Sequence, residues 1–259
     1  MPVHPTASDG YAAAGSDYER ARPVYPPAAI ELLCDELRLG PASVVVELGA
    51  GTGKLTRMLV PLVGTVVATE PVAAMRAELG ATVATPVVAA TAEAVPLASH
   101  CADAVVAATA FHWFRGPETL AEAERVLRRG GGLGLLWNNP DRDVDWVRRI
   151  WEIVDQHRGD TPGNRDLRWR AAFATAADLT PLEHRRFGHA VEVDVDGLLA
   201  RVASISFIAA LAPADRDAVL ARVRSITAVH PDLAGRARFE LPYRTELYWC
   251  RRRGPVDGP

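Results

Sequence analysis

The chain has 259 residues, 49% of them hydrophobic, which is enough to bury one substantial core with an elaboration. Its formal net charge of −3 and its scattered basic residues argue against nucleic acid as a partner, and its three widely spaced cysteines fit neither a disulfide framework nor a metal site. We therefore do not expect a bound metal. We find no signal-peptide pattern and no run of about 18 apolar residues, so we expect a cytoplasmic protein without membrane contact.

The first part of the chain contains the start of an α/β unit. Residues 1–26 are polar and interrupted by glycine and proline, which predicts an N-terminal arm rather than a core element. A helix is expected from Pro27 to Arg38, because proline suits the first helical position. Residues 43–47 form a short β-branched run typical of a strand buried on both faces of a parallel sheet, and a glycine-rich turn and a helix over residues 54–62 follow it.

Strands and helices continue to alternate up to Asn139. We expect a second strand and helix, a weaker third strand, a fourth strand, a helix that Gly130 closes and a fifth strand; their ranges are 65–69, 72–79, 82–88, 102–108, 116–130 and 133–137. Such alternation implies parallel pairing through right-handed crossovers. Ligands of these sheets bind beyond the carboxyl ends of the strands, which is where we look for functional residues.

The remaining chain departs from this alternation. Residues 146–157 and 197–230 have helical character, the second stretch being interrupted by Pro213, whereas residues 187–195 and 238–250 resemble strands. We expect the two late strands to complete a seven-stranded, mostly parallel sheet. The helical insertions should then cap the site at the end of the sheet.

A glycine-rich loop separates the first strand from its helix. Gly49, Gly51 and Gly53 would let the backbone approach a ligand, and free N–H groups at the helix start would point at it. Glu47 ends the first strand, and Glu70 ends the second at roughly the 20-residue interval where an acidic side chain takes ribose hydroxyls. This tight glycine spacing beside a carboxylate suits a cationic, phosphate-free nucleoside better than a pyrophosphate. Glu70 could instead only cap the following helix.

These features resemble a known family. The segment VVELGAGTGKLT at residues 45–56 resembles the first motif of class I S-adenosylmethionine-dependent methyltransferases of the methyltransferase type 11 group. Three later segments resemble the acidic second motif, the adenine-binding segment and the turn before the fifth strand of that family, at residues 68–71, 91–97 and 125–132. Residues 18–26 and 110–114 further resemble a subgroup of trans-aconitate methyltransferase-like proteins.

The resemblance covers roughly residues 18 to 138 and implies a Rossmann-like, doubly wound α/β fold. We therefore expect four parts: an N-terminal arm or lid over 1–26, a cofactor-binding core over 27–139, helical cap insertions with a late strand over 140–235, and a final strand with a tail over 236–259. The implied cofactor is S-adenosyl-L-methionine, and the resemblance names no metal.

The resemblance also implies which residues hold the cofactor. In the family, the first acidic residue and the glycines hold the methionine part, the second acidic residue holds the ribose, and the third motif holds the adenine. Thr91 stands where the family often has aspartate, which changes the expected contact to the adenine amino group. The expected cofactor-binding residues are Tyr18, Arg22, Glu47, Gly49, Ala50, Gly51, Gly53, Glu70, Pro71, Ala92, Glu93 and Ala110.

His112 is the candidate catalytic residue. It follows the fourth strand, where it would face the transferable methyl group, and a histidine of pKa near roughly 6.5 can take a proton from a hydroxyl or an amine. Alternatively, His112 and the aromatic residues around it are only wall and core. Arg22 presents a similar choice, because the arm could pair it with the cofactor carboxylate or leave it in solvent.

We expect O-, N- or C-methylation of a small-molecule acceptor, whose identity the sequence leaves open, as it does the oligomeric state. A nicotinamide-dependent oxidoreductase is a second possibility, but it predicts a longer glycine spacing than this chain has. A third is a protein that keeps the cofactor fold without transferring a methyl group, as a binding module or a cyclase, because fold does not fix function.

Overall fold

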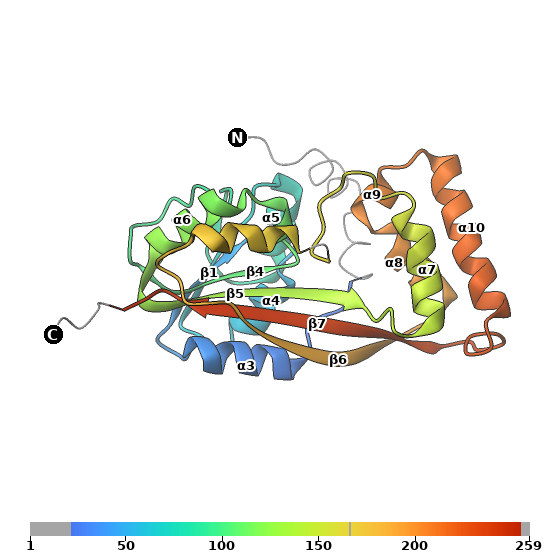
Figure 1. The fold of residues 1–259 in the computed structure, drawn as a ribbon, viewed down its shortest axis with the longest axis horizontal. Helices are drawn as coiled ribbons and strands as arrows, with labels where there is room; N and C mark the ends of the chain where they lie inside the picture. Colours follow the sequence, from blue (N-terminus) through green and yellow to red (C-terminus); the bar gives the residue numbers. More distant parts are fainter. Residues whose placement is uncertain (1–21, 166, 255–259) are drawn as a thin grey trace.

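The computed structural model describes residues 22–165 and 167–254 (Figure 1). The strands form one seven-stranded sheet of order β3-β2-β1-β4-β5-β7-β6. The first five strands are parallel to one another, and β7 lies antiparallel between β5 and β6. The predicted Rossmann-like, mostly parallel sheet is therefore confirmed. The strands are β1 Val44–Leu48, β2 Thr65–Thr69, β3 Val87–Val88, β4 Ala102–Ala108, β5 Leu127–Pro140, β6 Glu183–Val193 and β7 Phe239–Arg251.

Helices cover both faces of the sheet, and the alternation of side chains along β1 shows why. Val45 packs in one apolar cluster with α3 and α4, while Val46 packs in another with α6 and η2. A strand buried on both faces must be apolar at successive positions, which explains its continuous β-branched run. The helices of this core are α3 Pro27–Leu37, α4 Lys54–Leu59, α5 Ala73–Thr82, α6 Gly116–Val126 and the 3₁₀ helices η1 Phe111–Trp113 and η2 Arg168–Thr175.

Four further helices form a cap beyond one end of the sheet (Figure 1). They are α7 Asp145–Asp155, α8 Val195–Ala203, α9 Ser206–Ala209 and α10 Pro213–Val229. The cap has its own apolar cluster, in which residues of α7, α8 and α10 pack with the start of β7. The helical stretch predicted at 197–230 is thus three helices, and Pro213 begins the last one rather than interrupting a single helix.

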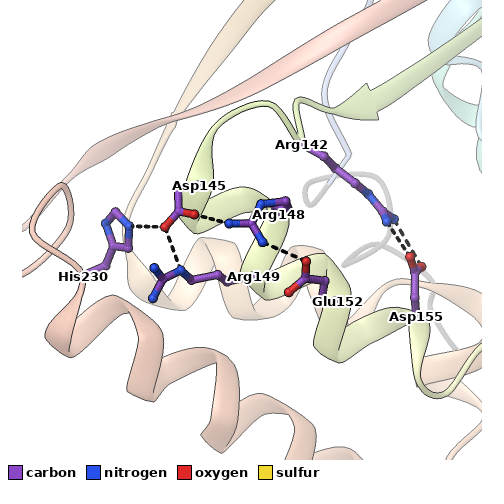
Figure 2. A network of polar contacts seen from close by, with 7 residues as sticks. All are labelled: Arg142, Asp145, Arg148, Arg149, Glu152, Asp155 and His230. Atoms are coloured by element: carbon purple, nitrogen blue, oxygen red, sulfur yellow. Dashed lines mark hydrogen bonds and ion pairs between the residues drawn. The ribbon is translucent and has the colours of Figure 1, made fainter.

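Polar contacts fasten the cap at both ends of α7 (Figure 2). At its start, Asp145 contacts Arg148 and Arg149 and accepts a hydrogen bond from His230 at 3.2 Å, which joins α7 to the end of α10. At its end, Asp155 pairs with Arg142, which follows β5. These contacts set the position of α7 relative to the carboxyl end of β5.

Several element boundaries differ from the sequence predictions. The fifth strand, expected at 133–137, covers Leu127–Pro140, and the helix expected at 54–62 ends at Leu59. The third strand is shorter than 82–88, because α5 continues to Thr82. The helix expected to end at Gly130 ends at Val126, since the chain enters β5 at once and Gly130 adopts a φ of 79° within that strand. The strand expected at 187–195 begins at Glu183 and ends at Val193, because the Asp194 side chain caps α8. In the described part of the chain, no helix is long and apolar enough to cross a membrane.

Candidate functional site

An open cavity lies at the carboxyl ends of β1, β2 and β4, with about 930 Å³ of empty space when the adjoining solvent is included. We call it the glycine-loop cavity. Its position is the one expected for ligand binding in a doubly wound sheet. The sequence-predicted residues that line it are Arg22, Glu47, Gly49, Ala50, Gly51, Glu70, Pro71 and Ala110.

The glycine loop forms one wall of this cavity. Gly49 and Gly51 have φ angles of 63° and 59°, a left-handed conformation that favours glycine. A Cβ atom on Gly49 would lie 3.0 Å from Phe114, whereas on Gly51 it would meet only the Met75 sulfur at 3.8 Å. Gly49 is therefore needed for close packing, and Gly51 for its backbone conformation beside open space.

Glu70 ties the end of β2 to the glycine loop. One carboxylate oxygen accepts a hydrogen bond from the Gly51 N–H at 2.9 Å, and the other accepts one from the Val72 N–H at 2.8 Å. Burial raises the pKa of Glu70, and these two hydrogen bonds oppose that rise. Val72 precedes α5, so Glu70 does bond to the start of that helix, and it also lines the cavity.

Glu47 is a buried carboxyl group in the same cavity, only 1% exposed. Burial raises its pKa to about 8, the charge of Glu70 adds to this effect, and Thr56 and Arg57 oppose it. The Thr56 hydroxyl donates to one carboxyl oxygen at 2.6 Å, and within residues 22–165 and 167–254 no group donates to the other. The other carboxyl oxygen of Glu47 can therefore accept a hydrogen bond from a ligand, preferably from a cationic group.

A second cavity, of about 760 Å³, adjoins the first one. We call it the cap cavity, because the end of β5, helix α7, the loop at 158–165 and the α8–α9 segment line it. The two cavities share wall residues, namely Arg22, Thr109, Trp113, Asn138 and Arg201. A ligand in either cavity would thus lie next to a ligand in the other.

The boundary between the cavities contains a strained residue. Thr109 follows β4 with a φ of 54°, a conformation that is a true outlier for a β-branched side chain. Its N–H donates to the Leu136 carbonyl at 2.7 Å, and its hydroxyl contacts the Tyr25 hydroxyl at 2.9 Å. Such strain persists where surrounding contacts enforce it, commonly at binding sites.

His112 lines the cap cavity only. The Trp137 indole N–H donates to His112 Nδ1 at 3.1 Å. Because an indole nitrogen can only donate, Nδ1 is unprotonated, and a neutral His112 carries its proton on Nε2. Burial, helped by the charges of Arg158 and Arg22, lowers the pKa of His112 to about 3. This arrangement does not suit the proton acceptor that we expected, and it makes Nε2 a hydrogen-bond donor.

We predict that the His112 ring stays neutral between about pH 5 and pH 8. Its folded pKa lies below the unfolded value of 6.5, so the effect on folding is a loss of stability as the pH falls from 6.5 toward 3. Nitrogen-15 chemical shifts of the ring would report both the charge and the tautomer, with His112→Gln identifying the signal. A ring that titrates near its ordinary value would contradict the prediction.

Comparison with known proteins places the chain in a family. A family model described as a methyltransferase domain matches residues 46–135. An uncharacterized methyltransferase of Mycobacterium tuberculosis is 38% identical over 232 residues, covering 88% of this chain and 89% of that protein. The chain belongs to the methyltransferase family. This places the family's matched segment on the strands and loops that form the glycine-loop cavity.

Two solved structures share the fold of this methyltransferase. A candidate type II methyltransferase from Anaeromyxobacter dehalogenans has a TM-score of 0.67 at 21% identity, covering 90% of this chain and 99% of that one. A cyclase has a TM-score of 0.53 at 14% identity, covering 88% and 81% of the two chains. The narrower resemblance to trans-aconitate methyltransferase-like proteins is not tested by these comparisons and stays a prediction.

Some predicted residues of the methyltransferase do not line the glycine-loop cavity. Ala92 packs in the apolar cluster beside the sheet, and a Glu93 carboxylate oxygen accepts a hydrogen bond from the Arg115 N–H at 3.0 Å. Gly53, with a φ of 89°, precedes α4, where a Cβ atom would clash with Leu79. The predicted roles of these residues stay predictions, as does that of Tyr18, which lies outside the described residues.

Sequence reasoning missed several wall residues of the methyltransferase. Asn138, near the end of β5, donates to the Val24 carbonyl at 3.0 Å and so holds the segment before α3 against the sheet. Its place at the carboxyl end of a parallel strand could have identified it. Arg201, on α8, is 5% exposed and donates to the Tyr243 hydroxyl at 3.1 Å. No local pattern predicts that a cap helix brings it to the site.

Proposed function

We propose that this methyltransferase binds S-adenosyl-L-methionine in the glycine-loop cavity and methylates a small-molecule acceptor bound in the cap cavity. The observation that carries the proposal is the pair of buried carboxyl groups, Glu47 and Glu70, beside an open glycine loop in one cavity. The adjoining cap cavity supplies a separate place for the acceptor.

The hydrogen-bond acceptors of the glycine-loop cavity fit this cofactor. Glu47 has an oxygen that receives no hydrogen bond within the described chain, and a cationic amino group would compensate its buried charge. Glu70 uses one lone pair of each oxygen for backbone N–H groups and retains others for ribose hydroxyls. A carboxylate here would also repel a phosphate, which disfavours nucleotides with charged phosphate groups.

The main task of the protein in this reaction is to position the cofactor and the acceptor next to each other. When bound, the cofactor would supply a methyl group on a cationic sulfur; the acceptor's lone pair would take up that group, and the sulfur would leave as a neutral thioether. The described residues orient the two reactants from adjoining cavities, which converts a bimolecular encounter into a preorganised one. His112 does not serve as the base in this proposal, so any proton released from the acceptor leaves by another route.

Two alternatives remain distinct from this proposal. A nicotinamide-dependent oxidoreductase would need the glycine loop to hold a pyrophosphate, whose negative charge gains no compensation from the buried carboxyl group of Glu47. A protein that holds the cofactor without transferring a methyl group, such as a cyclase, would use the same glycine-loop cavity. The fold that this chain shares with a cyclase is compatible with that alternative.

Calorimetric titration of the purified chain with S-adenosylhomocysteine, NAD and NADP tests the cofactor. We expect micromolar binding of S-adenosylhomocysteine alone. Binding of a nicotinamide cofactor instead, or of none of the three, would contradict the proposal. Transfer of an isotope-labelled methyl group to members of an acceptor panel then separates a methyltransferase from a protein that only holds the cofactor.

A further inference from the structure

The cap cavity gathers positive charge in a protein whose net charge is negative. Five arginines line it, and Asp155 is the only carboxylate among the described residues of its wall. The arginines come from the segment before α3, the segment after β5, the loop after α7 and helix α8; they are Arg22, Arg142, Arg158, Arg165 and Arg201. Segments far apart in the sequence thus bring the same charge to one cavity.

The single carboxylate is already engaged. Figure 2 shows Arg142 and Asp155 joined by two parallel contacts, with nitrogen to oxygen distances of 2.5 and 3.2 Å. This pair is close to neutral. Among the described residues, neither Arg158 nor Arg165 forms an ion pair. The hydrogen bond that Arg158 forms with the described part of the chain runs from its Nε to the Thr161 carbonyl at 3.3 Å.

The remaining charges act on one another and on their neighbours. Burial lowers the pKa of Arg165, and the charges of Arg142 and Arg158 lower it further, while the charges of Asp155 and Glu246 oppose this shift. Arg158 and Arg22 similarly disfavour a charge on His112. Charges of one sign that are gathered in a cavity repel each other and concentrate counter-ions there, which is typical of binding sites for the opposite charge.

The cofactor does not account for all of this charge. Arg22 and Arg201 line both cavities, so either could contact the carboxylate of the cofactor. Arg158 and Arg165 line the cap cavity, where the acceptor would bind, and not the glycine-loop cavity. Arg165 also borders a neighbouring pocket whose wall includes Asp141, Asp143 and Glu246. On this side His112, held by Trp137 with its proton on Nε2, offers another donor and no charge.

We propose that the cap cavity binds an acceptor that carries an anionic group, either a carboxylate or a phosphate, and that Arg158 and Arg165 hold this group. This inference rests on the proposed function, because it assigns the cap cavity to the acceptor. Guanidinium groups bind both anions through paired N–H donors, so the two kinds of anion share one recognition chemistry. The group acts as an anchor, and Arg158 and Arg165 act as positioning residues.

Calorimetric titration of the full chain, saturated with S-adenosylhomocysteine, tests the inference. The probes are acids paired with neutral analogues of similar shape: succinate with succinamide, 4-hydroxybenzoate with 4-hydroxybenzamide, and phenyl phosphate with phenol. We expect at least one acid to bind about tenfold more tightly than its neutral partner, and added salt to weaken that binding. Whether a carboxylate or the phosphate binds identifies the anion.

Variants of the two arginines locate the site. Arg158→Gln and Arg165→Gln should each weaken binding of the acid about tenfold while leaving the affinity for S-adenosylhomocysteine unchanged. Arg236→Gln makes the same change of charge at an exposed position outside both cavities and should change neither affinity. Two arginine variants with wild-type affinity for the acid, or a control that weakens it equally, would overturn the inference.

The titration also separates this inference from the proposed function. If wild-type protein does not bind S-adenosylhomocysteine, the proposed function fails, and titration of the acids alone still decides whether the cavity binds anions. If it binds S-adenosylhomocysteine but no acid binds more tightly than its neutral partner, the proposed function stands and the anionic acceptor is wrong.

Discussion

Replacement of Glu70 by alanine should weaken the binding of S-adenosylhomocysteine by at least tenfold. The change removes the carboxylate that we assign to the ribose hydroxyls, and hydrogen bonds to a charged group contribute about 1.5 to 3 kcal/mol. It also removes the acceptor for the Gly51 and Val72 N–H groups, which loosens the glycine loop. Calorimetry gives the affinity, and the midpoint of thermal unfolding shows whether the fold survives.

Asp194 offers a matched control for that experiment. It too is a carboxylate that accepts a backbone hydrogen bond, from the Gly197 N–H at 2.7 Å, but it lies at the start of α8 and lines neither cavity. Asp194→Ala should lower stability by about 1 kcal/mol, as the loss of a helix cap does, and leave the affinity unchanged. Wild-type affinity in Glu70→Ala would exclude Glu70 from the ribose role.

The sheet and the glycine-loop cavity were largely predictable, because local sequence determines them. A continuous β-branched run at residues 44–46 can be satisfied only by a strand buried on both faces. The glycines directly after it fix a backbone turn, and Glu70 ends the next parallel strand in register with them, since Thr69 pairs with Leu48. Parallel pairing therefore brings separate strand ends together without any further information.

The cap cavity was not predictable in the same way, because packing between distant segments determines it. Arg201 reaches the cavity only because α8 packs with α7 and the start of β7 in the cap cluster. The hydrogen bond from Trp137 to His112 joins β5 to η1 and occupies the Nδ1 atom of His112. This contact disfavours the proton-accepting role expected from the sequence, and the catalytic role of His112 stays a prediction. Sequence periodicity indicates which face of a helix is apolar, but not which other element of the fold that face packs against.

The free protein should have Glu47 mostly protonated at pH 7, because its folded pKa is about 8. A raised carboxyl pKa stabilises the fold fully below the unfolded value of 4.5, and this contribution is lost as the pH rises through 8. Within that window, the unfolding free energy should fall by up to about 1.4 kcal/mol per pH unit relative to Glu47→Gln, which cannot ionise. Thermal unfolding of both proteins across the window measures this difference.

Binding of the cofactor should reverse this preference, because a cationic amino group beside Glu47 favours the ionised carboxylate. S-adenosylhomocysteine should then release up to about one proton per site near pH 7, and its affinity should rise about tenfold per pH unit up to 8. Calorimetry in buffers of different ionisation enthalpy counts the protons.

In Glu47→Gln the affinity should be independent of pH in this range and well below wild type at pH 8. Thr56→Val removes the hydroxyl that donates to Glu47, so it should keep the proton release but move it to higher pH. Equal proton release in wild type and Glu47→Gln would mean that another group titrates on binding, and Glu47 would lose its assigned contact with the amino group.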